Sequence, residues 1–195
     1  SPATLYHYRV RSKDVAGNQA MSGDGTFTTL APPSGTVTQE WGMTSTSTYP
    51  NTVEDTWINL DTQNYSQATQ LNTYTWPADR IANAILMKWD LSAIPAGSTI
   101  QSATLYLYLE GYSGTGGDAT YDISAHKIIN KNPVIARATG ITYDGANQWT
   151  PNSCCPNGVP LAQADIAAAE DVRPVGKTLG YQAWTVTRMV QDWVS

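Results

Sequence analysis

The segment IQSATLYLYLEGY, at residues 100–112, has the pattern of a β-strand with one buried face. Its alternate positions form two sets: Leu105, Leu107 and Leu109 on one side, and Thr104, Tyr106, Tyr108 and Glu110 on the other. Successive side chains of a strand point to opposite faces. The segment therefore predicts a strand whose leucines face the core and whose Tyr106 and Tyr108 form an outward stripe.

Further short strands are predicted on both sides of this segment. Alternation or short apolar runs, bounded by turn residues, predict strands at residues 69–75, 81–91, 120–129 and 181–186. Residues 161–172 are rich in helix formers and predict a short helix. Many short strands with little helix are typical of an all-β sandwich, and here favour a jelly-roll-like one.

The N-terminal residues form a separate pattern. Tyr6, Tyr8 and Val10 alternate with polar residues, and the sequence DVAGN at residues 14–18 predicts a turn. This spacing resembles the second half of a fibronectin type III domain, an immunoglobulin-like sandwich, with Tyr6 at the tyrosine-corner position. The predicted domain organisation has three parts: residues 1–31 as the C-terminal part of such a domain, residues 32–37 as a linker, and residues 38–195 as the main sandwich.

The composition excludes two classes of partner. Only 14% of the residues are charged, against roughly 25% in an average soluble domain, and the net charge is −5. Nucleic-acid binding needs a basic surface, so it is not expected. No apolar run reaches the ~18 residues of a membrane span, so membrane insertion is not expected either. A polar, weakly charged chain with seven Trp and eleven Tyr is typical of secreted β-proteins that bind sugars.

Several segments together resemble one known family. The segments are MKWDLSAIPAG at 87–97, IQSATLYL at 100–107, ATGITYDG at 138–145 and WTVTRMVQDW at 184–193. The sequences of these segments and their order resemble those of the DNRLRE-type module. The resemblance implies a jelly-roll sandwich in modular secreted bacterial proteins, where some members are assigned as carbohydrate-binding modules. It also implies that the sandwich at 38–195 lacks its last strand or strands.

The functional prediction is a non-catalytic, extracellular carbohydrate-binding or adhesion module, secreted or at the cell surface. Its partner would be a polysaccharide or cell-surface glycan. His7 and His126 fall in different predicted units and no Gly-x-Ser-x-Gly elbow is present, so no catalytic residues are assigned. The alternative is a structural subunit of an extracellular filament or surface layer, completed by strand exchange between neighbouring copies.

Two aromatic groups are the predicted ligand-binding residues. Trp76, Arg80 and Lys88 lie close together in the sequence, and Tyr143 and Trp149 share a loop. Sugar rings stack on aromatic faces while nearby charged groups bond their hydroxyls, so these five side chains are candidates for glycan contact.

The remaining candidates concern metal and sulfur chemistry. A structural calcium ion needs six to eight oxygen ligands, for which Asp118, Asp122, Asp144 and Asp171 are candidates. No other cofactor is predicted. The adjacent Cys154-Cys155 pair could close a vicinal disulfide in an oxidising compartment or remain two loop thiols.

Overall fold

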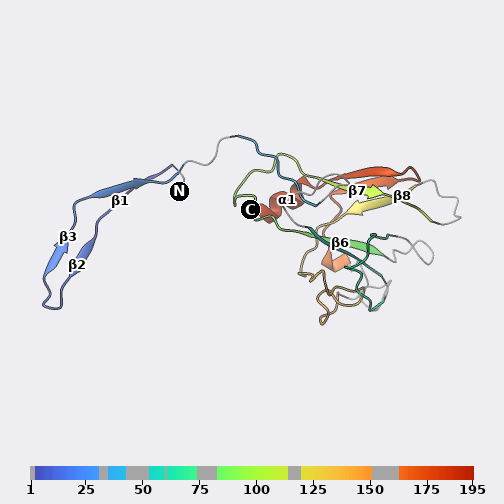
Figure 1. Cartoon of the computed structure of the whole chain (residues 1–195), viewed down its shortest axis with the longest axis horizontal. Coiled ribbons are helices and arrows are strands. Elements are labelled where there is room, and N and C mark those ends of the chain that lie inside the picture. The colour runs from blue at the N-terminus through green and yellow to red at the C-terminus, as the bar shows by residue number, and fades with distance from the viewer. Residues whose placement is uncertain are drawn as a thin grey trace. The chain divides into compact units, whose positions relative to one another are not determined.

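The computed structural model describes residues 3–30, 35–42, 53–59, 61–73, 83–113, 120–150 and 163–195 (Figure 1). The chain divides into two compact units, Ser1–Thr38 and Gln39–Ser195. Among the described residues, no helix has the length and apolar character needed to cross a membrane.

The first unit is an antiparallel hairpin whose two arms are each interrupted once. β1 (Leu5–Tyr8) pairs with β4 (Gly25–Thr28), and β2 (Arg11–Lys13) pairs with β3 (Gln19–Met21). Asp14 closes the tip by accepting hydrogen bonds from the backbone of Ala16 and Asn18, as its turn sequence predicts. No described residue of this hairpin is buried, and its likeness to a fibronectin domain stays a prediction.

The second unit contains three antiparallel strand pairs. β5 (Val53–Ile58) pairs with β6 (Ala84–Trp89), β7 (Thr104–Leu109) with β10 (Gly180–Thr185), and β8 (Tyr121–Ala125) with β9 (Asp171–Val175). A 3₁₀ turn, η1 (Gln163–Asp165), precedes β9, and α1 (Thr187–Val194) follows β10. The described residues are therefore mainly β, as the sequence predicts.

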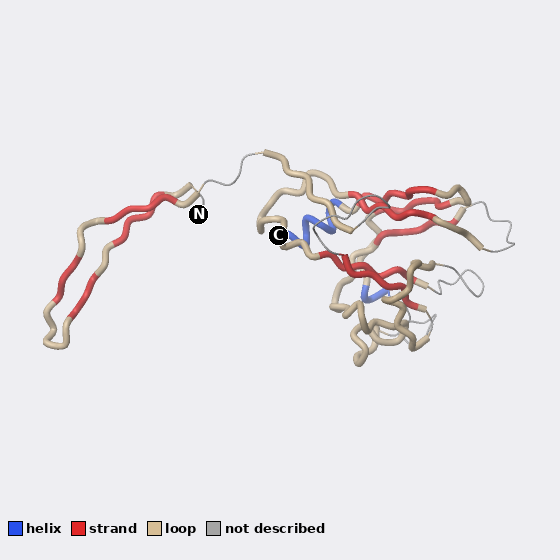
Figure 2. The backbone as a smooth tube through the Cα atoms, viewed as in Figure 1, coloured by secondary structure: helices blue, strands red, loops and turns tan. Residues whose placement is uncertain are grey.

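The strand pairs form two layers. β10 contacts β9, which places the β7–β10 pair next to the β8–β9 pair. The buried Trp184 of β10 donates from Nε1 to the carbonyl of Ile123 on β8, at 2.8 Å. This group occupies one side of the unit and the β5–β6 pair occupies the other (Figures 1 and 2). The fold is thus an all-β sandwich, which confirms the predicted fold class.

The start of β7 is set by a distant element. The strand predicted at residues 100–112 covers Thr104–Leu109 in the structure, and the backbone before Thr104 bonds to α1 instead. Ile100 donates its N–H to Gln191 Oε1 at 2.8 Å, and Ala103 donates to Thr187 Oγ1 at 2.9 Å. Side chains of α1 thereby satisfy backbone groups that a longer strand would have paired.

Two predicted elements are wrong. Residues 69–73 of the expected strand at 69–75 form no strand. Of the expected helix at 161–172, the described residues 163–172 form only the 3₁₀ turn η1 and the start of β9 at Asp171. Helix-forming composition is overridden there by tertiary bonds. The buried carboxylate of Asp165 accepts from Thr150 N at 2.7 Å and Thr150 Oγ1 at 2.8 Å. That anchor holds η1 against the 139–150 loop.

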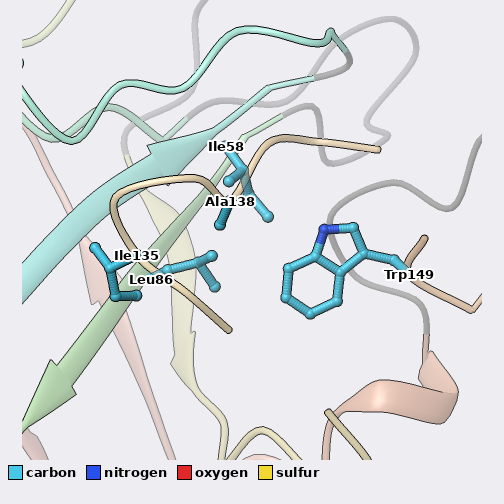
Figure 3. Close-up of a cluster of buried hydrophobic side chains, with 5 residues drawn as sticks. All are labelled: Ile58, Leu86, Ile135, Ala138 and Trp149. Carbon is cyan, nitrogen blue, oxygen red and sulfur yellow. The ribbon is translucent and has the colours of Figure 1, made fainter. Parts of the chain in front are cut away.

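The hydrophobic core lies between the β5–β6 pair and the loop of residues 134–150. Figure 3 shows its five members: Ile58, Leu86, Ile135, Ala138 and Trp149. Ile58 and Leu86 come from the strands and the other three from the loop. The loop therefore functions as a packed layer of the protein.

Candidate functional site

Three tyrosines form an exposed patch on the outer side of β7 and β10. Tyr106 and Tyr108 lie on β7 and Tyr181 lies on β10, and they are 63%, 58% and 58% exposed. In the antiparallel register Tyr181 stands opposite Tyr108, and Ala183 stands opposite Tyr106. These three side chains are called the tyrosine face below.

Strand alternation explains why the tyrosines point outward. The intervening residues of β7, Leu105 and Leu107, are half-buried, and Trp184 of β10 is buried. Packing of these inner residues fixes the register, because a slip by one position would exchange the two faces. The tyrosine face is therefore held on two paired strands, and such elements position a site more accurately than loops do.

The rings of Tyr108 and Tyr181 meet edge to face. Their centroids are 5.1 Å apart and their planes make an angle of 82°. This is a favoured geometry for an aromatic pair. Tyr106 has the small residue Ala183 as its cross-strand partner, so no aromatic ring stands directly opposite it on β10.

The two strands that carry the tyrosine face are uncharged, and charged residues lie at both ends of β10. The sequences of β7 and β10 contain no charged residue. Glu110 directly follows β7 and is exposed, and Lys177 lies in the turn before β10 with its Nζ 5.9 Å from the ring centroid of Tyr112. At the other end of β10, Asp171 accepts the N–H of Thr185 and is paired with Arg173. The acidic and basic groups described around this surface therefore balance, which suits an uncharged or weakly charged ligand.

Trp149 was predicted to contact ligand, but the structure places it in the core. It is 4% exposed, and its Nε1 donates to the carbonyl of Thr139 at 2.9 Å. The indole is packed against Ile58 and Leu86 (Figure 3), so it offers no free ring face to a sugar. The prediction for Trp149 is corrected on this ground.

Tyr143 and Lys88, two other predicted residues, lie apart from the tyrosine face. Tyr143 is half-buried, meets Trp149 edge to face at 5.8 Å, and has Lys131 Nζ 5.4 Å from its ring centroid. Lys88 is exposed on β6 and its Nζ donates to Asn132 Oδ1 at 3.4 Å. Trp76 and Arg80 lie outside the described residues. Their part in binding stays a prediction.

The predicted calcium ligands do not gather in the described part of the chain. There, no three acidic, histidine or cysteine side chains lie close enough to share a metal ion. Asp122 lies on β8, Asp144 in a turn and Asp171 at the start of β9. Asp118, Cys154 and Cys155 fall outside the described residues, so calcium and the vicinal disulfide remain untested.

Two of these carboxylates are already occupied by hydrogen-bond donors. Bonds from the side chain and backbone of Asn147 lower the pKa of Asp144 below its usual value. The backbone N–H of Thr185, at 2.7 Å, and the charge of Arg173 lower the pKa of Asp171. Each group accepts bonds that stabilise a turn or join β9 to β10. Both therefore have a structural role.

None of the three tyrosines was among the predicted ligand-binding residues, and of the three only Tyr181 was not predicted to face outward. Tyr106 and Tyr108 are recognisable from their alternation with leucine, but pairing of β7 with a strand over 70 residues away cannot be read from local pattern. A usable signal exists in YQAW at residues 181–184, where Tyr181 and Ala183 alternate with Trp184. Trp184 as the buried position would place Tyr181 outward.

Comparison with known families adds a functional class to this geometry. Residues 46–132 match the model of carbohydrate-binding module family 96. The matched region contains β5 to β8, and so includes Tyr106 and Tyr108, whereas Tyr181 lies beyond it. Comparisons with curated proteins and with solved structures gave no match.

The match supports the coarser part of the prediction. The chain carries a domain like a carbohydrate-binding module, and modules of that kind are generally non-catalytic. The implied partner is a carbohydrate. The DNRLRE-type and fibronectin-type resemblances stay predictions.

Proposed function

We propose that this protein is a non-catalytic carbohydrate-binding module of a modular extracellular protein, and that the tyrosine face is its binding surface. The observation that carries the proposal is the exposure of Tyr106 and Tyr108 on a rigid strand inside the region that matches family 96. Exposed aromatic residues gathered on one face are a common mark of a binding surface.

The chemistry of tyrosine suits a sugar partner. Its ring offers an apolar face to the C–H groups of a pyranose, and its hydroxyl can donate to or accept from sugar hydroxyls. Tyrosine also loses little conformational entropy on binding, because it has few rotatable bonds. With the near-neutral surroundings of the face, the expected ligand is a neutral or mildly acidic polysaccharide or cell-surface glycan.

Binding to immobilised glycans tests this function. The wild-type protein and the triple variant Tyr106→Ala/Tyr108→Ala/Tyr181→Ala would be run by affinity electrophoresis in gels containing a panel of soluble polysaccharides. We expect at least one polysaccharide to retard the wild type and not the triple variant. Equal retardation of both proteins would show that the tyrosine face is not the binding surface. The carbohydrate function would be contradicted if no polysaccharide retarded the wild type and no glycan on an array bound it.

A structural subunit of a filament or surface layer is the second candidate. Within the described residues, β7 is paired on one side only, by β10, and its inner Leu105, Leu107 and Leu109 remain half-exposed. An edge strand of this kind can accept a strand from a neighbouring molecule. Light scattering after size exclusion, with electron microscopy, tests it: fibres favour assembly, and a stable monomer at high concentration contradicts it.

A further inference from the structure

Tyr108 and Tyr181 place two phenol rings in contact at the protein surface. Their ring centroids are 5.1 Å apart, and each residue is 58% exposed. Elsewhere in the described chain, Tyr6 stacks on Phe27 and Tyr143 meets Trp149, so the ring opposite each of those tyrosines carries no phenol hydroxyl. Tyr108 and Tyr181 are therefore two oxidisable phenols that touch each other and are both open to reagents in solution.

The pairing of the strands keeps these two side chains together. Tyr108 on β7 stands directly opposite Tyr181 on β10 in the antiparallel register, and side chains in such positions have Cβ atoms about 4.5–5.5 Å apart. Exposed side chains change rotamer within picoseconds to nanoseconds. Rotation of the two rings can therefore bring their edges together while the strands stay paired.

The chemistry of phenols makes such a pair reactive toward one-electron oxidants. A phenol that loses one electron and its hydroxyl proton becomes a phenoxyl radical, with unpaired electron density on the ring carbons next to the oxygen. Two of these radicals combine through a carbon–carbon bond, and the hydrogen on each bonded carbon then moves to the phenol oxygen. The two rings together lose two hydrogen atoms, and one hydrogen peroxide molecule takes them up and is reduced to two water molecules.

Contact between the rings favours this partner over the other tyrosine nearby. Groups held together on one molecule react far faster than the same groups free in solution. Tyr106 is exposed as well, but it lies about 7 Å along the strand from Tyr108 and faces Ala183 on β10. Tyr181 should therefore couple with Tyr108 and not with Tyr106.

We propose that Tyr108 and Tyr181 form an oxidative cross-linking site, at which hydrogen peroxide and a haem peroxidase join the two rings by a carbon–carbon bond. This bond links β7 covalently to β10, and thiol reductants do not open it. It also restricts the unfolded chain between two distant positions, which stabilises the folded state. The cross-link is a property beyond the proposed carbohydrate binding and does not depend on it.

Peptide mapping of the oxidised protein tests this site. The full chain, at several low concentrations, would be treated with hydrogen peroxide and a haem peroxidase and then digested with trypsin. Residues 178–188 form a tryptic peptide whose one tyrosine is Tyr181, and residues 89–127 form the peptide that contains Tyr108. By mass spectrometry we expect these two peptides joined, with two hydrogen atoms fewer than their sum. The joined fraction should not depend on protein concentration, and the cross-linked protein should unfold at a higher urea concentration.

Two matched variants assign the bond to its residues. Tyr108→Phe keeps the ring and removes the phenol, so peptide 178–188 should no longer be cross-linked. Tyr106→Phe makes the same change at the neighbouring exposed position, and the cross-link should persist. Three results would each overturn the proposed site: a cross-link at Tyr181 that survives in Tyr108→Phe, coupling that disappears on dilution and so joins separate molecules, or no joined peptides in the wild type. None of these results depends on whether the protein binds a glycan.

Discussion

Glu170 and Met189 join the segment before β9 to the first turn of α1. Glu170 Oε2 accepts the backbone N–H of Met189 at 2.8 Å, and its Oε1 accepts that of Arg188 at 2.7 Å. The N-cap residue Val186 supplies no side-chain bond, so Glu170 caps the helix from a distant part of the sequence. Its negative charge also faces the positive end of the helix dipole.

Replacement of Glu170 should therefore destabilise the protein. Glu170→Ala leaves two helix N–H groups unpaired, and we expect a loss of about 1–2 kcal/mol in the free energy of unfolding. Glu54→Ala, at an exposed position of β5, serves as the control, with an expected change within about 0.5 kcal/mol. Urea unfolding measures both. Equal stabilities of the two variants would show that the cap is not needed.

Gly140 should tolerate no side chain. A Cβ at this position would overlap the carbonyl oxygen of Asn59, a backbone atom that cannot rotate away. Gly140→Ala is expected to cost about 2 kcal/mol or more, or to prevent folding. Gly111→Ala is the matched control, since nothing lies within 4 Å of its added Cβ. A soluble Gly140→Ala variant with a wild-type melting temperature would refute the close approach.

Asn83 is a buried polar residue that could be replaced without loss of stability. It is 1% exposed, and within the described part of the chain neither its Oδ1 nor its Nδ2 has a hydrogen-bond partner. A buried polar group without a partner is costly, so Asn83→Leu should leave the stability unchanged or raise it. A loss of more than about 1 kcal/mol would reveal a bound water or another partner.

Asn64 provides the contrast to Asn83. Its Nδ2 donates to the carbonyls of Ile135 and Ala138 at 2.9 and 2.7 Å. Asn64→Leu would leave these carbonyls unpaired, and we expect a loss of about 1–3 kcal/mol. Thermal unfolding of the two leucine variants side by side gives the comparison.

The stability of the β9–β10 contact should depend on pH through Asp171. The N–H of Thr185 and the charge of Arg173 lower the pKa of Asp171 from 3.8. The stabilisation is therefore complete above the unfolded-state pKa and is lost as the pH falls through the lower, folded-state pKa. Asp171→Asn should be less stable than the wild type near neutral pH, and the difference should shrink on acidification to about pH 2.

Asp55 supplies a control of opposite sign. Partial burial raises the pKa of Asp55 above 3.8, so its charge opposes folding at neutral pH and this penalty disappears on acidification. Asp55→Asn should be more stable than the wild type near pH 7, and the gain should fall towards zero below the ordinary carboxylate range. Unfolding curves that show the same pH trend for both variants would contradict these assignments.

The sequence predicts which segments form strands better than it predicts the residues at which those strands begin and end. Alternation at residues 100–112 locates β7 and separates its leucine face from its tyrosine face, because the strand period is local. The start of β7 depends on Gln191 and Thr187, which bond from α1 to the backbone before it. Residues 163–172 are wrongly predicted helical because their burial and pairing involve Thr150 and β8, which are distant in the sequence.

In the candidate site too, local pattern predicts some residues and tertiary contacts place the others. Tyr106 and Tyr108 follow from local pattern, whereas Tyr181 joins them only through the pairing of β7 with β10. Trp149 cannot be assigned to core or surface from its loop sequence alone. Contacts with Ile58 and Leu86, which lie on β5 and β6, bury it. Aromatic composition therefore predicts that a sugar-binding surface exists more readily than it predicts where that surface lies.

The most direct test of the account compares the affinity of one polysaccharide for three single variants, measured by affinity electrophoresis. The variants are Tyr108→Ala in the tyrosine face, Trp76→Ala in the group predicted from sequence, and Tyr8→Ala in the first unit. The account predicts that Tyr108→Ala weakens binding about tenfold while Tyr8→Ala binds as the wild type does. Loss of binding in Trp76→Ala, with full affinity in Tyr108→Ala, would place the site elsewhere and contradict the central claim.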